Sequence, residues 1–198
     1  YQCDWSSDVC SSDLVNSGAL IADTSGALFL GGNFTTGNLG SITLTNGGTV
    51  QLSGNLTNTA ATLNAPTGGA YSLSGTIIGG NIVDTALLAN GGILDSATVL
   101  GNLTLGTNHL TLQNGANWTG TATVGTAGQS GGFICFAGNF SFTPGSNLTL
   151  TGSNTNVLFS GSQNTITVTP GSTLTRTGTG STSLQNHLAN SGSITVNG

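Results

Sequence analysis

One short motif, a glycine and an asparagine followed by an apolar residue, recurs along this chain and constrains its fold more than any other feature. It stands at Gly32-Asn33-Phe34, Gly54-Asn55-Leu56, Gly80-Asn81-Ile82, Gly101-Asn102-Leu103 and Gly138-Asn139-Phe140. The first four asparagines (Asn33, Asn55, Asn81 and Asn102) are separated by 22, 26 and 21 residues. A repeat of about 20 to 50 residues is typical of solenoids, in which each repeat forms one coil. We therefore expect one motif per coil, with the glycine at a bend and the asparagines stacked as a ladder of amides.

A second repeat supports the same interpretation. The segment 143–151 begins Thr-Pro-Gly-Ser, and the same four residues return 26 positions later at the start of 169–177. Pro-Gly predicts a turn, and the alternating Leu and Thr residues that follow predict a strand. Two of the three prolines thus occupy corresponding places in two neighbouring repeats.

Short strands with alternating apolar and hydroxyl residues are predicted between glycine-rich turns. The expected strands are 27–30, 41–45, 49–52, 70–73, 102–105, 110–113, 147–151, 156–159, 165–169 and 193–196. An antiparallel sandwich would also use short strands, but it does not need a fixed repeat. The prediction is therefore an all-β fold: a single-stranded parallel β-helix, or solenoid, that is right-handed and has roughly eight coils of about 22 residues.

The composition excludes several classes of function. Only 4% of the residues are charged, and Arg176 is the one residue counted as Lys or Arg. Nucleic-acid binding is not expected, because phosphate contacts need several cations. The sequence also contains no run of about 18 apolar residues that would predict a membrane-spanning helix. A hydrophobic content of 36% argues against disorder, since disordered chains combine low hydrophobicity with high charge.

The first fourteen residues differ from the rest of the chain. They contain Cys3 and Cys10, two of the three cysteines, and no glycine. The segment 4–14 resembles the translation of a common short-read sequencing adapter. We interpret residues 1–14 as a non-native, adapter-derived segment and residues 15–198 as a β-helix repeat fragment of a larger protein. With no histidine nearby, the two cysteines also make a poor zinc site.

Few side chains could carry chemistry, and their spacing does not bring them together. His109 and His187 lack a nearby second ligand, so we interpret them as solvent-exposed turn residues. Asp84 and Asp95 are 11 residues apart, about half a coil, and should lie on different sides of a solenoid. A glycosidase needs two carboxyl groups across one bond. The expectation is therefore no catalytic, cofactor-binding or metal-binding residue, and no cofactor.

The most apolar segment is 133–142, which contains four of the seven phenylalanines. In a strand, Phe133 and Cys135 would face one way and Ile134 and Phe136 the other. We interpret the segment as an aromatic stack in the core, with Cys135 as a small core residue. The alternative is a sticky groove for a ligand or a partner.

Pairs of threonines separated by one residue form another pattern. They occur in the segments 121–123, 149–151, 165–169 and 173–177. Threonine is a good strand former on a solvated face, and this is the interpretation we favour, because irregular coil lengths and Arg176 would disturb a flat array. Threonines in register over four or more neighbouring coils would instead favour binding to ice or to a crystalline polysaccharide.

Three segments carry a family resemblance: 47–59 (GGTVQLSGNLTNT), 71–80 (YSLSGTIIGG) and 92–101 (GILDSATVLG). They resemble the β-helical repeat regions of large bacterial surface proteins, such as autotransporter passengers and filamentous-haemagglutinin-like adhesins. The resemblance extends over residues 15–198. It implies export, a location outside the cell or on its outer surface, and glycans, other surface proteins or neighbouring coils of the parent chain as partners.

The expected function is a structural or adhesive segment of a bacterial cell-surface or secreted protein, without catalysis. Two alternatives stay open. The chain could be a non-catalytic part of a β-helical carbohydrate-active enzyme, or a solenoid that binds ice or glycans through a threonine face.

Overall fold

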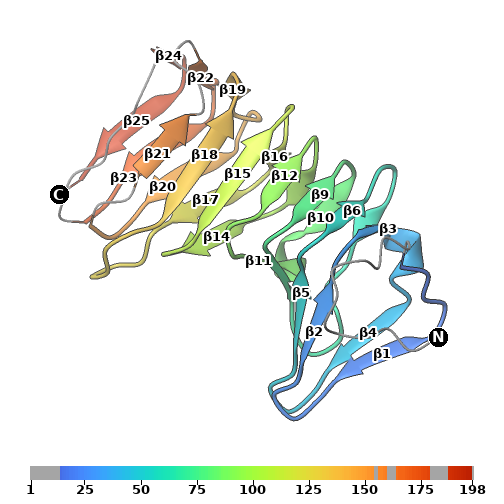
Figure 1. Ribbon diagram of the computed structural model, residues 1–198. Helices are drawn as coiled ribbons and strands as arrows, with labels where there is room; N and C mark the ends of the chain where they lie inside the picture. The colour runs from blue at the N-terminus through green and yellow to red at the C-terminus, as the bar shows by residue number, and fades with distance from the viewer. Residues whose placement is uncertain (1–13, 154–155, 160–163, 179–186, 198) are drawn as a thin grey trace.

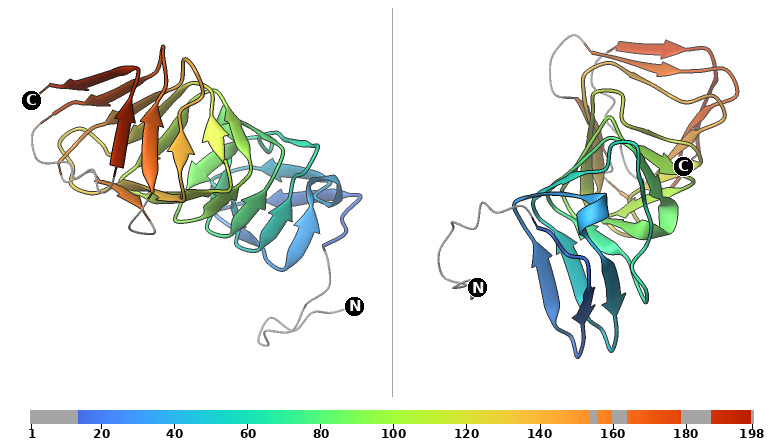
Figure 2. Two further views of the ribbon diagram at one scale, coloured as in Figure 1. Left: turned by 90° about the horizontal axis from the view of Figure 1, so that it is seen from above. Right: turned by 90° about the vertical axis from the view of Figure 1, so that its right-hand side faces the viewer.

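The computed structural model describes residues 14–153, 156–159, 164–178 and 187–197. Within these ranges the chain winds into a parallel β-solenoid of about seven turns, and its coils stack from β1 to β25 (Figure 1). The N-terminal and C-terminal coils lie at opposite ends of this stack (Figure 2). The predicted all-β solenoid is confirmed, with about one coil fewer than expected. The adapter-like residues 1–13 lie outside the described residues, and the right-handed sense stays a prediction.

One sheet runs along nearly the whole stack and takes one strand from each of seven successive coils. It consists of β3 (Asn33–Thr35), β6 (Asn55–Thr57), β9 (Thr76–Ile78), β12 (Ile93–Asp95), β15 (His109–Gln113), β18 (Phe133–Ala137) and β21 (Asn156–Phe159). We call it the seven-stranded sheet.

A second side of the solenoid is built from two sheets, one after the other. The first sheet consists of β2 (Ala27–Leu30), β5 (Thr49–Leu52), β8 (Tyr71–Leu73) and β11 (Leu87–Ala89). The next coils contribute β14 (Leu103–Gly106), β17 (Thr121–Val124), β20 (Asn147–Leu150), β23 (Thr173–Arg176) and β25 (Ser193–Val196), which we call the five-stranded sheet. Because β11 contacts β14, the two sheets follow each other on the same side.

The third side also changes sheet partway along. It begins with β7 (Thr62–Leu63), β10 (Asn81–Val83), β13 (Thr98–Leu100) and β16 (Asn117–Trp118) and continues with β19 (Phe140–Ser141), β22 (Thr165–Val168) and β24 (His187–Asn190). At the N-terminal end, β1 (Ala19–Ala22) pairs with β4 (Ser41–Leu44). Two 3-10 helices, η1 (Thr36–Asn38) and η2 (Asp84–Ala86), complete the elements.

The core consists of straight rows of apolar side chains that point inward from successive coils. In the seven-stranded sheet one such row is Phe34, Leu56, Ile77, Leu94, Leu112 and Phe136, and each of these side chains is at most 3% exposed. Alternation along a strand sends every second residue inward, so each coil covers the row of its neighbour. The solenoid therefore has one continuous core.

The expected aromatic stack forms in this core. The ring of Phe136 stacks on Phe140 with centroids 4.1 Å apart, and Phe140 stacks on Trp118 at 5.2 Å. Phe142 meets Trp118 edge-on at 5.6 Å. Such geometries are favourable for aromatic pairs. The prediction that segment 133–142 supplies core aromatics is confirmed.

Glycines at one corner permit the close approach of neighbouring coils. A side chain at Gly54 would place its Cβ 2.2 Å from the carbonyl oxygen of Gly32, and one at Gly75 would stand 2.1 Å from that of Gly54. The amides of Asn55 and Thr76 donate to these two carbonyls. Gly54 lies between β5 and β6, and Gly75 lies between β8 and β9. Since only glycine lacks a Cβ, this corner of the coil requires it.

All ten strands named from the sequence are found, with boundaries that differ by one residue at most. The first four Gly-Asn motifs fall one to a coil, but the expected stacking of their asparagines is wrong beyond the second copy. Asn33 pairs with Asn55 in the seven-stranded sheet, but Asn55 then pairs with Thr76, while Asn81 begins β10 on the third side. Coil length changes from 22 residues here to 16 where Tyr71 pairs with Leu87, so a fixed spacing cannot keep the motif on one side.

Candidate functional site

Arg176 lies inside the solenoid. It is in register with Leu150 of the preceding coil, and only 6% of its surface is exposed. Its Nη1 donates to the carbonyl of Leu150 at 3.2 Å and its Nη2 to that of Gly152 at 2.6 Å, and Nη1 also donates to the carbonyl of Thr177. A guanidinium bonded to backbone carbonyls stabilises a corner, and it does not point toward a substrate. The expectation that Arg176 would disturb the outer face is therefore wrong.

Asp95 joins two neighbouring coils through hydrogen bonds. Asp95, in β12, accepts hydrogen bonds from Asn114 (2.9 Å), Gln113 (2.8 Å) and Ser96 (2.9 Å). The bond from Asn114, followed by those from Gln113 and Ser96, lowers the pKa of Asp95 below its usual value. A carboxylate with a lowered pKa stays ionised at neutral pH, so it is a poor general acid.

Asp23 behaves in the same way in the turn after β1. Its side chain accepts hydrogen bonds from Asn46 and Thr45 of the next coil, both at 2.8 Å, and from the amide of Thr24. These bonds lower the pKa of Asp23, with the bond from Asn46 as the largest cause. Asp84 lies in η2, where one carboxylate oxygen accepts from the amide of Asn102 at 3.4 Å. Since η2 lies between β10 and β11 while Asp95 belongs to the seven-stranded sheet, Asp84 and Asp95 lie on different sides of the solenoid, as the spacing predicted.

The histidines and the cysteine occupy outer positions of strands. His109 begins β15 and stacks on Phe133 of the next coil, with ring centroids 4.7 Å apart and 9° between the planes. His187 begins β24 and is exposed. Both were expected in turns, and the structure places both in strands. Cys135 lies on the outer side of β18 between the buried Ile134 and Phe136, and it is half-buried, so the expected core position is wrong.

These groups do not converge on one place. Within the ranges that the structure describes, no three residues of His, Cys, Asp or Glu lie close enough to hold a metal ion. No helix in the same ranges is long and apolar enough to cross a membrane.

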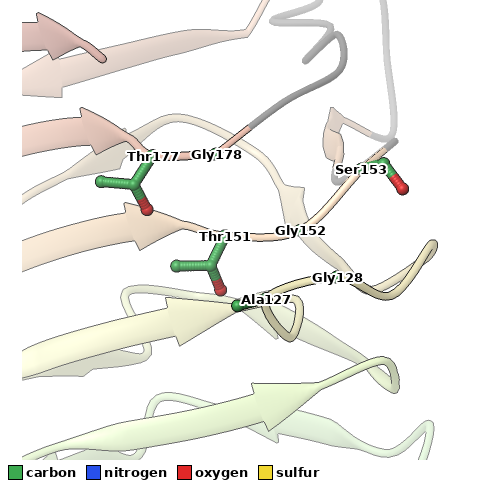
Figure 3. A pocket seen from close by; sticks show the side chains of 7 residues that line it. All are labelled: Ala127, Gly128, Thr151, Gly152, Ser153, Thr177 and Gly178. Atoms are coloured by element: carbon green, nitrogen blue, oxygen red, sulfur yellow. The ribbon is translucent and has the colours of Figure 1, made fainter. Parts of the chain in front are cut away.

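A hollow of about 470 Å³ lies beside the ends of β17, β20 and β23 (Figure 3). The described residues that line it are Ala127, Gly128, Thr151, Gly152, Ser153, Thr177 and Gly178. Thr151 Oγ1 donates to the carbonyl of Gly125 at 3.0 Å, and Thr177 Oγ1 to that of Leu150 at 3.4 Å. None of these seven side chains is ionisable, so this lining can offer shape and hydroxyl groups but no acid or base.

The outer side of the five-stranded sheet carries a straight row of threonines. Register pairs Thr104 with Thr123, Thr123 with Thr149, Thr149 with Thr175, and Thr175 with Thr195. We call these five residues the threonine row. Thr104 and Thr195 are exposed, and the three between them are half-buried.

The hydroxyl groups of the threonine row do not hydrogen-bond to any residue that the structure describes, in contrast with those of Thr151, Thr169 and Thr45. Thr151 and Thr169 donate to backbone carbonyls of the preceding coil, and Thr45 donates to Asp23. The threonine row therefore presents methyl and hydroxyl groups to solvent from one side of the molecule.

Sequence reasoning identified part of this row and missed its ends. Thr123, Thr149 and Thr175 belong to the threonine pairs named above, whereas Thr104 and Thr195 do not. A broader pattern finds all five: a small polar residue, an apolar residue, then threonine. It reads Asn102-Leu103-Thr104, Thr121-Ala122-Thr123, Asn147-Leu148-Thr149, Thr173-Leu174-Thr175 and Ser193-Ile194-Thr195.

Comparison with known proteins leaves the family of this chain open. No family model, no curated protein and no solved structure gives a significant match.

Proposed function

We propose that residues 15–198 are a structural and adhesive segment of a larger bacterial protein that is secreted or displayed on the cell surface, and that this segment catalyses no reaction. The observation that carries the proposal is the unbroken inward row of the seven-stranded sheet, from Phe34 to Phe136. A row of this kind makes an elongated body whose stability comes from contacts between neighbouring coils. Such a body suits a stalk.

The placement of the polar groups supports the same function. Asp23, Asp95 and Arg176 each hold neighbouring coils together through hydrogen bonds. Their side chains are thus engaged in the architecture, and they lie in different coils. The partners we propose are host or environmental glycans, other surface proteins and neighbouring coils of the parent chain.

Labelling of intact cells tests the location. Antibodies raised against the purified chain should bind intact cells of the bacterium that carries the gene, or should detect the protein in its culture medium. An antibody against a cytoplasmic protein is the control for cell integrity. Detection only after permeabilisation would refute the proposed location.

Incubation with a panel of soluble and insoluble polysaccharides tests the absence of catalysis. The chain should release no new reducing or unsaturated ends above a heat-denatured sample. Release of such ends by the folded chain would show that the segment is an enzyme.

A further inference from the structure

We propose that the threonine row is an ice-binding face, a function that goes beyond the structural one. The row is formed by Thr104, Thr123, Thr149, Thr175 and Thr195 on adjacent parallel strands. Adjacent strands are about 4.8 Å apart, so the row presents a methyl and a hydroxyl at that interval. The proposed ligand is the surface of an ice crystal, a lattice of neutral hydrogen-bonding groups at regular spacing.

The regularity of the row survives the irregular coil lengths. Successive threonines of the row are 19, 26, 26 and 20 residues apart in the sequence, yet each is the direct register partner of the next (Thr104, Thr123, Thr149, Thr175, Thr195). The additional residues are accommodated elsewhere in the coil, for example in the segment 125–132 between β17 and β18. The first objection to a flat array, irregular coils, therefore does not apply to this sheet.

The free hydroxyl groups favour an external ligand. A second column on the same face is Thr121, Asn147, Thr173 and Ser193. In that column Thr173 Oγ1 donates to Asn147 Oδ1 at 2.7 Å, so its hydroxyl is engaged within the protein. The threonine row has no such bonds among the described residues. Since a β-branched side chain has few rotamers, the row is held ready for contact at little entropic cost.

The face is electrically neutral. Arg176 points into the core, Asp23 lies in the turn after β1, and Asp95 lies in β12 of the seven-stranded sheet. Asp84, in η2, lies beside the start of β14, where it accepts from the amide of Asn102, but it is not part of the five strands. A charge on the face would retain its own hydration shell and oppose close contact with a neutral lattice. The outward side chains of these five strands thus carry no charge, which is complementary to ice.

Ice is favoured over a crystalline polysaccharide by the side chains of the same strands. Sugar rings present apolar faces that stack on aromatic side chains, but β14, β17, β20, β23 and β25 contain no aromatic residue. The row offers only small methyl and hydroxyl groups. We therefore assign the face to ordered water rather than to glycan chains.

Strand propensity alone does not explain the row, because another outer face of the same molecule differs. In the seven-stranded sheet the corresponding outward row contains Asn33, Asn55, Thr76, Ile93, Thr111 and Cys135. If threonine were chosen only as a good strand former, both faces would show a similar mixture. The uniform row is confined to one side.

Thermal hysteresis, the gap between the melting and freezing points of ice in the presence of the protein, tests the proposal. The whole chain should produce hysteresis and should be incorporated into a slowly growing ice crystal, whereas a control protein is excluded. Thr149→Lys, at the centre of the threonine row, should lose most of both effects. The matched control Thr111→Lys, at the centre of the seven-stranded sheet, should keep them.

Circular dichroism and thermal melting establish that both variants are folded. The proposal is overturned if the folded wild-type chain shows no hysteresis and is excluded from ice. It is also overturned if Thr111→Lys loses as much as Thr149→Lys, or if the chain sediments with crystalline cellulose and not with ice. The surface location proposed above is tested separately by cell labelling, so one proposal can fail without the other.

Discussion

The seven-stranded and five-stranded sheets build their inner faces in the same way and their outer faces differently. Inside, Leu94 and Leu148 each belong to a row of apolar side chains and are fully buried. Outside, the row nearest the C-terminal ends of the strands is mixed in the seven-stranded sheet: Thr35, Thr57, Ile78, Asp95, Gln113 and Ala137. In the five-stranded sheet the threonine row is uniform.

This difference shows which positions folding constrains. Burial demands apolar residues on both inner faces, since each coil must cover the next, and the one buried charge among the described residues, Arg176, has backbone carbonyls as partners. Burial places no such demand on an outer face, which can vary as it does in the seven-stranded sheet. Uniformity on the outside of the five-stranded sheet thus calls for a cause other than folding, and a ligand is such a cause.

The largest expected effect tests whether the two inner faces are equivalent. Leu94→Ala and Leu148→Ala each leave a cavity in a fully packed row, so each should lower the free energy of unfolding by about 2–5 kcal/mol. Denaturant unfolding followed by circular dichroism measures both. A much smaller loss of stability for Leu148→Ala would show that the five-stranded sheet is packed more loosely. The inner faces of the two sheets would then not be equivalent.

The next effect concerns the corner that follows the seven-stranded sheet. Asn58 is fully buried; its Nδ2 donates to the carbonyls of Gly79 (3.2 Å) and Asn81 (2.7 Å), and its Oδ1 accepts from Thr36. Asn58→Ala should cost about 2–3 kcal/mol, because buried carbonyls lose their donor.

Asn55→Ala is the matched control for Asn58→Ala. It removes an exposed bond of 2.9 Å to Asn33. Among the described residues, this is the one bond of the expected amide ladder that joins two asparagine side chains directly. Surface changes of this kind cost at most about 0.5 kcal/mol. Equal melting temperatures for the two variants would contradict the role of the buried amide.

A third test compares the two Pro-Gly turns that precede strands of the five-stranded sheet. Ser172 Oγ bonds the carbonyl of Thr143 at 3.0 Å and lies 3.1 Å from Thr169 Oγ1, so Ser172→Ala should lower stability by about 1 kcal/mol. Ser146 occupies the corresponding place one coil earlier, and its buried Oγ has no partner among the described residues. Ser146→Ala should therefore raise stability by up to about 1 kcal/mol. A lower melting temperature for Ser172→Ala and a higher one for Ser146→Ala would confirm that the two hydroxyl groups differ in their hydrogen bonding. Equal decreases in melting temperature would refute it.

The smallest effect is the pH dependence that Asp95 of the seven-stranded sheet contributes. Hydrogen bonds, first of all from Asn114, lower the pKa of Asp95 in the folded state. These bonds contribute to the free energy of unfolding at pH values above the pKa of an unfolded aspartate, about 3.9. The contribution is lost as the pH falls through the lower pKa of Asp95 in the folded state. Wild-type stability should thus decline slightly more in acid than that of Asp95→Asn, in melting curves recorded from neutral pH to pH about 3. Parallel curves would show that the bonds of Asp95 contribute nothing.

The strands were predictable from sequence where alternation is long enough to recognise. Segments such as 165–169 carry several apolar and hydroxyl residues in turn, and this pattern predicts a strand whatever its neighbours are. Three-residue strands such as β9 (Thr76–Ile78) are too short to show a period. They exist because neighbouring coils supply hydrogen-bond partners on both sides.

The register was beyond sequence reasoning, and so was the site that depends on it. Coil length ranges from 16 residues, where Tyr71 pairs with Leu87, to 26, where Asn147 pairs with Thr173. A single sequence does not tell which corner contains the additional residues. The position of Arg176 was equally hidden, because an arginine is expected outside unless backbone carbonyls, here of Leu150 and Gly152, satisfy its donors.

The corner between β17 and β18 has a practical consequence for anyone who wishes to attach this protein to something else. Gly128 lies in the segment 125–132, and a side chain added there would meet no atom within 4 Å. Lengthening a flexible loop costs little, about 0.6 kcal/mol for each doubling. A peptide tag inserted at this corner lies outside both sheets, so we expect the strands to keep their register and the molecule to be immobilised with its outer faces uncovered.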